Sequence, residues 1–397
     1  MNPVERVGRP WISVTALCFV LNMFDGVNIF TLTYVAPALE HRFSIGSEAF
    51  SIVFSAGLAG MALGGLLVAP QADRIGRRPV LFVALTLMGA AMVASAYAPS
   101  VAWLCLARLF VGVGIGTVLA SISALSAGFA PERYRNTAVG LPQAGYPIGA
   151  TVAGFATAWA LPLYGWSAVF LVAGLLTLAL VPLCLALVRE PPELGEHPPY
   201  SLSVAIAGRR LKSSLLLWLC TICGFMALYF IASWITKLAI QAGLPQRQAI
   251  IASAIYSAGA FFGTVLTSFI AARLDIRAVV SATLVLAAAT FLIFGGVKMT
   301  VGWTLVVCFL IGVTLQGGVN GVYPLVAGAY PARARATGLG WAMGVGRIGA
   351  VIGPMIGGWA LNRGLPLAAT FAIFCIPLLV TATAAIGVDP AAARTAQ

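Results

Sequence analysis

Long apolar segments recur along the whole chain, and they restrict it to one class of fold. A stretch of about 20 apolar residues is long enough to cross a ~30 Å hydrocarbon core as an α-helix. Only 9% of the 397 residues are charged and the mean hydropathy is +0.99, whereas about 25% of the residues of a typical soluble domain are charged. The sequence therefore predicts an all-α polytopic membrane protein and excludes a soluble enzyme.

Hydropathy and helix-breaking residues predict twelve transmembrane helices. The predicted spans are 11–39, 48–70, 80–97, 101–128, 137–161, 166–188, 214–240, 247–270, 278–296, 301–328, 337–361 and 367–387. The longest polar stretch, residues 189–213, is typical of a cytoplasmic linker. It divides the chain into an N-terminal six-helix bundle at 1–188 and a C-terminal six-helix bundle at 214–397.

The net charge of +12 is explained by topology. Of the 23 Lys and Arg residues, 16 lie on one side of the predicted spans, 5 lie on the other side and 2 lie within spans. Positive residues accumulate on the cytoplasmic side, so both termini are predicted to be cytoplasmic. The basic residues form short clusters, so we expect no nucleic-acid partner.

The two halves of the chain are related by an internal repeat. With an offset of 200, residues 131–150 align with residues 331–350 without a gap, and 8 of the 20 positions are identical. A parallel repeat of six helices is the arrangement in which two bundles rock about a site near the bilayer midplane. The repeat favours alternating-access transport over a channel, a receptor or a membrane-embedded enzyme.

Three ionisable residues lie deep within predicted spans: Asp25, Arg108 and Arg347. Each costs on the order of 3 kcal/mol at the bilayer centre, so each is expected to face protein or a water-filled cavity. The repeat places Arg347 at the position of Pro147 and Arg108 at the position of Cys308. Arg347 either binds the anionic group of a substrate or bonds to backbone carbonyls, and Arg108 is expected to have a structural or gating role.

A polar stripe surrounds Asp25 on the first predicted helix. Asn22, Asp25 and Asn28 are spaced at i, i+3 and i+6, which places them on one helix face. A lone carboxylate there could take up and release a proton. The alternative is a permanent structural pair between Asp25 and an arginine.

The loop after the second span contains Asp73, Arg74, Arg77 and Arg78. A carboxylate among guanidiniums can form charge-assisted bonds to neighbouring helix ends and so gate one bundle arrangement. The alternative is an ordinary positively charged cytoplasmic loop. The sequence Asp-Arg-Ile-Gly-Arg-Arg at 73–78 resembles the loop signature of the major facilitator superfamily, and Arg108 with the glycines that follow it resembles that superfamily's fourth-helix motif. The resemblance implies the major facilitator fold.

Two segments resemble one branch of that superfamily, the aromatic acid:proton symporters. They are Asp25-Gly-Val-Asn28 with Ala36-Pro-Ala-Leu39, and the segment from Tyr330 to Pro354 around Arg347. The resemblance implies proton-coupled uptake of an aromatic carboxylate, of the benzoate or hydroxybenzoate type, across a bacterial inner membrane. The family's second acidic position is Asn28 here, so proton coupling rests on Asp25 or is absent.

Polar and aromatic residues at helical spacing are further candidates for substrate binding. With Arg347 and Asn28, the predicted substrate-binding residues are Gln143, Tyr146, Gln316, Asn320, Tyr323 and Trp341. A planar substrate could stack on an aromatic ring while its carboxylate pairs with the Arg347 guanidinium. For any one of these aromatic residues, lipid contact or core packing is the alternative.

Other solutes remain open within the same fold. An aliphatic organic acid, or a drug exported in exchange for protons, is the alternative substrate, and the glycine-proline sequence Gly349–Pro354 faintly resembles antiporter motifs. The sequence offers no catalytic constellation, no metal-ligand cluster and no cofactor motif, so we expect no enzyme activity. The expected partners are a small organic anion, a proton and the lipid bilayer, and the chain is expected to be a monomer.

Overall fold

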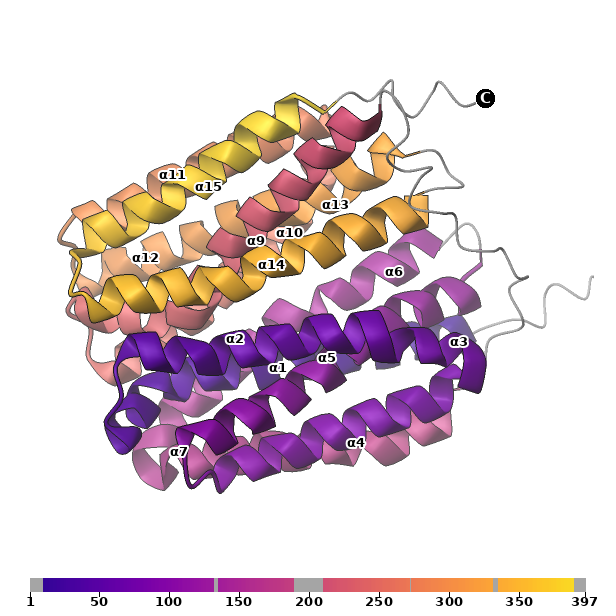
Figure 1. Cartoon of the computed structure of the whole chain (residues 1–397), viewed down its shortest axis with the longest axis horizontal. Coiled ribbons are helices and arrows are strands. Elements are labelled where there is room, and N and C mark those ends of the chain that lie inside the picture. Colours follow the sequence, from indigo (N-terminus) through magenta and orange to yellow (C-terminus); the bar gives the residue numbers. More distant parts are fainter. Residues whose placement is uncertain (1–9, 132–134, 189–209, 272, 331–334, 389–397) are drawn as a thin grey trace, which may run out of the picture. The chain divides into compact units, whose positions relative to one another are not determined.

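The computed structural model describes residues 10–131, 135–188, 210–271, 273–330 and 335–388. Within these ranges every regular element is a helix (Figure 1). The α-helices are α1 (Pro10–Phe43), α2 (Ser47–Leu63), α3 (Ala72–Ile75), α4 (Arg77–Ala96), α5 (Val101–Phe129), α6 (Arg135–Gln143), α7 (Gly145–Leu187), α9 (Arg210–Gln241), α10 (Gln246–Ala271), α11 (Ile276–Gly296), α12 (Val301–Ile311), α13 (Gly317–Ala329), α14 (Arg335–Asn362) and α15 (Leu367–Ile386). The prediction of an all-α fold is confirmed.

Eleven segments of the described residues are long and apolar enough to cross a membrane. The fifth, Gly140–Leu187, has 48 residues, which is more than one crossing requires. Its helix is interrupted at Gly165, where φ is 75° and ψ is 176°, a backbone conformation that glycine adopts readily because it has no Cβ. The interruption lies between the predicted spans 137–161 and 166–188, so the eleven segments cover the twelve predicted spans.

Two helix ends differ from the predicted boundaries. α1 continues through Pro37 to Phe43, so the first predicted span at 11–39 is too short and Glu40 lies within the helix. α9 begins at Arg210, so the last residues of the expected linker at 189–213 are helical. The rest of that linker lies outside the described residues.

The chain folds into two compact units that do not follow the sequence halves throughout. Unit 1 contains Met1–Leu32 and Ala56–Glu196, and unit 2 contains Thr33–Ser55 and His197–Gln397. The tip of the hairpin formed by α1 and α2 therefore packs with C-terminal residues. The division into bundles at 1–188 and 214–397 remains a prediction, from which the packing departs at this hairpin tip.

In unit 1, α4 packs against α5 and α7. Met88 and Met92 of α4 are fully buried. Small residues bring the helices close together, since a Cβ added at Gly89 would lie 2.7 Å from the Leu178 side chain of α7. Close packing of this kind holds membrane helices together where apolar burial gives no preference for protein over lipid.

The core of unit 2 contains a cluster of phenylalanines from α9, α11 and α15. The rings of Phe230 and Phe374 stack with their centroids 3.6 Å apart. Phe291 and Phe371 each meet the Phe230 ring edge-on, and all four side chains are fully buried. Aromatic clusters add a preference for geometry to the burial of area, so this cluster fixes α9 against α15.

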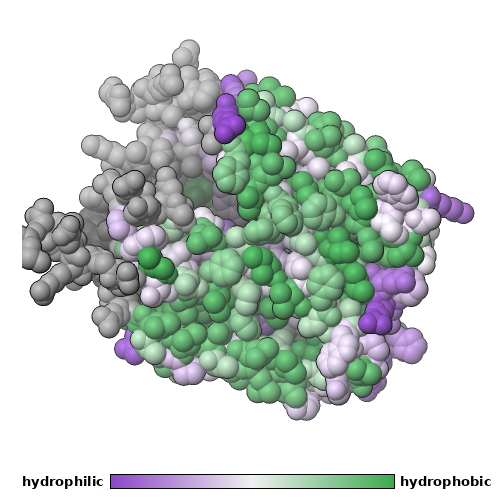
Figure 2. Space-filling model, turned by 180° about the vertical axis from the view of Figure 1, so that it is seen from behind, coloured by the Kyte–Doolittle hydropathy of each residue, from purple (hydrophilic) through white to green (hydrophobic). Residues whose placement is uncertain are grey.

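Apolar side chains also cover the outside of the helices. Figure 2 shows hydrophobic residues over most of the face in view, with hydrophilic residues toward its margins. Leu66, Leu67, Phe269 and Ile376 are each at least 60% exposed. Apolar exposure on this scale is unusual for a soluble protein and fits helices surrounded by lipid.

Two close helix approaches recur at matching positions of the repeat. In each of them a Cβ added to a glycine would overlap a backbone carbonyl of the facing helix. The pairs are Gly149 on Met23 and Gly64 on Val113 in unit 1, and Gly349 on Ile222 and Gly263 on Val313 in unit 2. The repeat seen in the sequence is therefore also a repeat of helix packing within each unit.

Candidate functional site

The polar stripe of α1 is completely buried in the structure. Asn22, Asp25 and Asn28 each have 0% exposure. Asn22 Nδ2 donates a hydrogen bond to the carbonyl of Pro142 at 2.8 Å, and Asn28 Nδ2 donates to Thr177 Oγ1 at 3.1 Å. The two amides therefore tie α1 to α6 and α7 on either side of Asp25.

Asp25 differs from its two neighbours in its hydrogen bonding. Neither of its carboxylate oxygens is hydrogen-bonded to any of the residues that the structure describes. Among those residues it also forms no ion pair with an arginine. The alternative of a permanent Asp–Arg pair is therefore absent from this conformation.

Arg108 reaches the same stripe from α5. Its Nη2 donates to the backbone carbonyl of Asn28 at 2.8 Å, and its Nη1 lies 3.2 Å from Met92 Sδ. The residue is 3% exposed. The guanidinium links α5 to α1 through a backbone carbonyl, which is the geometry of a structural contact, and its gating role remains a prediction.

Arg347 of α14 lies in an aromatic environment within unit 2. Its Nη1 donates to Tyr229 Oη of α9 at 2.9 Å. The guanidinium carbon is 5.7 Å from the centroid of the Phe225 ring, within the range of a cation–π contact. The Phe225 ring in turn lies 6.5 Å from the ring of Tyr323 on α13. Arg347 is only half-buried, so its side chain is partly accessible in a cluster with Tyr229, Phe225 and Tyr323.

Two of the remaining predicted binding residues bond to each other. Gln316 Nε2 donates to Asn320 Oδ1 at 3.2 Å, and Asn320 Nδ2 donates to Thr264 Oγ1 at 2.8 Å. These three polar side chains form a network between α10 and the helix of Asn320. The amides of Gln316 and Asn320 thus serve helix packing in this conformation, and their role in substrate binding remains a prediction.

Three further predicted residues have other surroundings. Tyr146 is half-buried and meets the Phe30 ring edge-on with centroids 6.0 Å apart. Gln143 is exposed, and Trp341 is 46% exposed on the helix of Arg347. Their assignment to substrate binding remains a prediction.

The basic segment after α2 is anchored to a helix end through Arg78, which lies in the first turn of α4. Arg78 Nη2 donates to the carbonyl of Leu185, near the end of α7, at 2.6 Å. Arg74 is exposed and Arg77 is half-buried. Asp73 belongs to α3, but its side chain lies outside the described residues. The gating role of this cluster remains a prediction.

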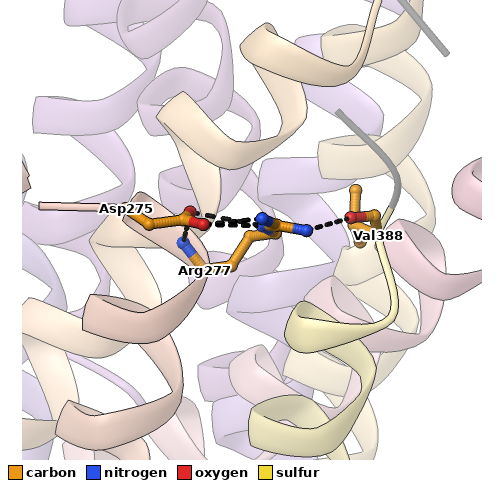
Figure 3. Close-up of polar contacts among 3 residues, drawn as sticks. All are labelled: Asp275, Arg277 and Val388. Atoms are coloured by element: carbon orange, nitrogen blue, oxygen red, sulfur yellow. Dashed lines mark hydrogen bonds and ion pairs between the residues drawn. The ribbon is translucent and has the colours of Figure 1, made fainter. Parts of the chain in front are cut away.

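The second half of the chain has a similar contact between an arginine and the end of a helix. Asp275 accepts hydrogen bonds from the Arg277 side chain, the shortest at 2.6 Å, and Arg277 Nη1 donates to the carbonyl of Val388 at 3.3 Å (Figure 3). The hydrogen bonds from Arg277 lower the pKa of the Asp275 carboxyl. An arginine therefore reaches the end of the last helix of each half.

Four residues that take part in these contacts or in a second buried pair were not predicted from the sequence. Tyr229 and Phe225 stand one turn apart in the apolar α9, where aromatic residues give no signal that distinguishes a site from core packing. Glu40 and Lys237 pair within unit 2. Glu40 lies one residue past the predicted span at 11–39, and it is within the helix because α1 continues through Pro37 to Phe43.

The chain also matches known proteins over most of its length. The sequence model of the Major Facilitator Superfamily matches residues 16–324 and 217–396. The gallate transporter of Pseudomonas putida is 28% identical over 94% of this chain and 90% of its own. The 3-(3-hydroxy-phenyl)propionate transporter of Escherichia coli (strain K12) is 32% identical over 91% of this chain and 90% of its own.

A solved structure shows the same fold. A bacterial homolog of the human lysosomal transporter Spinster superposes with a TM-score of 0.74 at 19% sequence identity, and the match covers 96% of each chain. At that identity the likeness concerns the fold alone. The aromatic-acid transporters found as relatives confirm the branch that the sequence motifs resemble.

Proposed function

Since the chain belongs to the major facilitator superfamily and is a multi-pass membrane transporter, not an enzyme, we propose that it takes up an aromatic carboxylate together with a proton. Its relatives are named for the transport of gallate, 4-hydroxybenzoate and 3-(3-hydroxy-phenyl)propionate. These are ring compounds that each carry a carboxylate. A monocyclic, hydroxylated aromatic acid is therefore the proposed substrate class.

The observation that carries this proposal is a guanidinium among aromatic rings inside an apolar span. Arg347 contacts Tyr229 and the face of Phe225 and remains half-buried. A guanidinium has five N–H donors in a planar fork that matches the two oxygens of a carboxylate, so Arg347 is chemically suited to pair with one. The Tyr229 hydroxyl accepts from Arg347 and can donate its own proton to the same carboxylate.

The ring of the substrate has a place in the same cluster. Phe225 and Tyr323 lie within ring-contact distance of each other beside Arg347. An aromatic acid that pairs with Arg347 could therefore contact these rings by offset or edge-to-face packing. An aliphatic acid would keep the ion pair and lose the ring contacts, which gives the site a preference of about 0.5–1.5 kcal/mol per aromatic contact.

Asp25 is the proposed proton carrier. Its carboxylate is completely buried and has no hydrogen-bonding partner among the described residues. A buried charge without a partner is costly, so a proton that neutralises Asp25 stabilises the conformation seen here. Exposure of Asp25 to water in another conformation would release the proton, and transport would thereby be coupled to the pH gradient.

The repeat of helix packing supports alternating access as the mechanism. Equivalent glycine contacts hold the first half and the second half, and parallel repeats of this kind rock about a midplane site. We place the chain in a bacterial inner membrane as a monomer with both termini cytoplasmic. The Lys and Arg asymmetry of the sequence and the bacterial relatives support this arrangement.

A binding panel tests the proposed substrate class. The purified protein is titrated calorimetrically with 4-hydroxybenzoate, gallate, 4-hydroxybenzamide, hexanoate and succinate. We expect binding of the two aromatic acids, at least tenfold weaker binding of the aliphatic acids and no binding of the amide. Equal affinity for the amide and the acid would contradict the role of Arg347.

A further inference from the structure

The tip of the first helical hairpin, residues 33–55, belongs with the C-terminal helices. It packs within unit 2, whereas the remainders of α1 and α2 belong to unit 1. In a transporter that alternates between two access states, a tip of this kind must part from the C-terminal helices in one state. The contacts that hold it within unit 2 therefore decide how readily the two states exchange.

One ammonium group joins both helices of the hairpin to α9. Lys237 Nζ pairs with Glu40 Oε2 near the end of α1 and contacts Ser47 Oγ at the start of α2. The Glu40 residue is 8% exposed. Its other oxygen, Oε1, is buried without a hydrogen-bonding partner among the described residues. Lys237 is therefore the group that compensates the Glu40 charge.

The ion pair lies beside an aromatic contact that ties α2, α9 and α14 together. The Trp234 ring is 5.8 Å from Lys237 Nζ and 5.1 Å from the ring of Phe54. Trp234 Nε1 donates to the carbonyl of Pro354 at 2.9 Å, and the Trp234 side chain is fully buried. Since Trp234 lies one turn before Lys237, packing of its ring fixes the position of the lysine stem.

Neutral hydrogen bonds fix the register of the hairpin tip. Thr33 Oγ1 donates to the carbonyl of Ala232 at 2.7 Å, and Ser55 Oγ donates to the carbonyl of Val351 at 2.9 Å. These bonds lie at the two ends of the segment 33–55. The ion pair lies between them in the sequence, where α1 ends and α2 begins.

An ion pair is suited to a contact that must open. Its net contribution to stability is small, because the attraction is offset by the cost of removing both charges from water. When the hairpin parts, water hydrates both charges and recovers that cost. An apolar contact has no such compensation, since parting it exposes apolar surface to water.

We propose that Glu40, Ser47 and Lys237 form a latch that closes this end of the transporter, the outer end by the predicted topology. The proposal rests on the proposed alternating-access function. It assigns to Lys237 a gating role that is separate from the substrate cluster at Arg347. Loss of the Glu40 charge is expected to let the hairpin tip separate from α9 more often.

A buried cysteine reports directly on opening of the latch. Thr33, the first residue of the tip, is 1% exposed and contacts α9, so Thr33→Cys is expected to react with a water-soluble maleimide only when the tip separates. The rate is measured by mass spectrometry on purified protein in nanodiscs, with labelling of the seven native cysteines subtracted using the chain that lacks the Thr33→Cys change. Glu40→Gln in this background is expected to raise the labelling rate ~10-fold, the change that about 1.4 kcal/mol produces.

Glu48→Gln is the matched control. It makes the same chemical change at the exposed contact of Glu48 with Asn362, which also joins α2 to α14, and it is expected to leave the labelling rate unchanged. A second test exchanges the charges: Glu40→Lys with Lys237→Glu should return the rate toward that of the parent.

An equal labelling rate in the Glu40→Gln and parent proteins would overturn the latch. If Glu40→Gln does not yield a monodisperse protein, Ser47→Ala removes the other Lys237 contact and should raise the rate by a smaller factor. An unchanged rate in Ser47→Ala would then contradict the proposal. Because labelling requires no substrate, a negative result is distinguishable from failure of the proposed aromatic-acid transport.

Discussion

The two halves of the chain share a frame and differ in their buried polar groups. The frame recurs in the glycine contacts, where Gly149 meets Met23 in the first half and Gly349 meets Ile222 in the second. The frame also recurs at two arginines near helix starts. Arg78 donates to the carbonyl of Leu185, and Arg277 donates to the carbonyl of Val388. None of these contacts requires a substrate.

The charged groups within the spans do not recur. Counting from the glycine contacts, Gly224 stands where the first half has Asp25. Cys308 stands in place of Arg108, and Arg347 stands in place of Pro147. The first half thus holds the completely buried carboxylate of Asp25, whereas the second half holds the half-buried guanidinium of Arg347 among aromatic rings. We therefore propose that repeated residues build the frame and unrepeated residues carry the chemistry.

Asp25→Asn is the change with the largest expected effect. It keeps the shape of the side chain and removes the proton site, so accumulation of substrate against a gradient should be abolished. Counterflow exchange needs no net proton movement and should persist. Both are measured with radiolabelled substrate in proteoliposomes, and Asp275→Asn in the exposed loop is the matched control. Continued accumulation in response to a pH gradient would place the proton elsewhere.

Arg347→Lys tests the guanidinium of the second half. An ammonium keeps the charge but lacks the planar two-donor fork, so the dissociation constant for an aromatic acid should rise ~30–150-fold, equivalent to about 2–3 kcal/mol. Calorimetric titration measures it, and the exposed Arg363→Lys serves as control. If Arg347→Ala bound the acid as tightly as the parent does, Arg347 would not belong to the site.

Tyr229→Phe should have a smaller effect of the same kind. The change removes the hydroxyl that accepts from Arg347 and keeps the ring, so affinity for the acid should fall about fivefold, as expected for one hydrogen bond of about 1 kcal/mol. Turnover at saturating substrate should stay near that of the parent. Tyr164→Phe, on an exposed ring of the first half, controls for loss of a hydroxyl. An unchanged dissociation constant would limit the role of Tyr229 to packing.

The smallest effects are expected from substitutions of Arg78 and Arg277, which lie in the first turns of α4 and α11. Arg78→Gln and Arg277→Gln each remove a hydrogen bond to a helix end, so each should lower the free energy of unfolding by about 1 kcal/mol, measured by thermal unfolding in detergent. If only the first loop gates transport, Arg78→Gln should also slow turnover, whereas Arg277→Gln should not. Equal slowing by both variants would extend the gating role to the second loop.

Much of the frame could be predicted from the sequence, because its signals are local or periodic. Apolar length predicted the spans, and the offset of 200 aligned Gly149 with Gly349 and Val113 with Val313, one partner of each recurring helix contact. The burial of Asp25 followed from its position within a span. That no described residue hydrogen-bonds to it could not be predicted, because hydrogen bonds between distant helices leave no pattern in the sequence.

The candidate site was predicted only in part for the same reason. Arg347 was identifiable as a charge in an apolar span, but Tyr229 becomes relevant only when α9 packs against α14. Glu40 lies one residue beyond the first predicted span at 11–39, whereas α1 continues through Pro37 to Phe43. The ion pair of Glu40 with Lys237 depends on the packing of the hairpin tip, residues 33–55, within unit 2.

Uptake under separately imposed gradients tests the central claim most directly. Proteoliposomes containing the protein are given radiolabelled 4-hydroxybenzoate with either a pH gradient, acidic outside, or a membrane potential clamped by valinomycin and potassium. One proton carried with a monoanion moves no net charge, whereas one uncompensated charge would gain ~2.3 kcal/mol per 100 mV. The account predicts concentrative uptake driven by the pH gradient and little response to the potential. Uptake that followed the potential and ignored the pH gradient, or no uptake of the aromatic acid under either gradient, would contradict it.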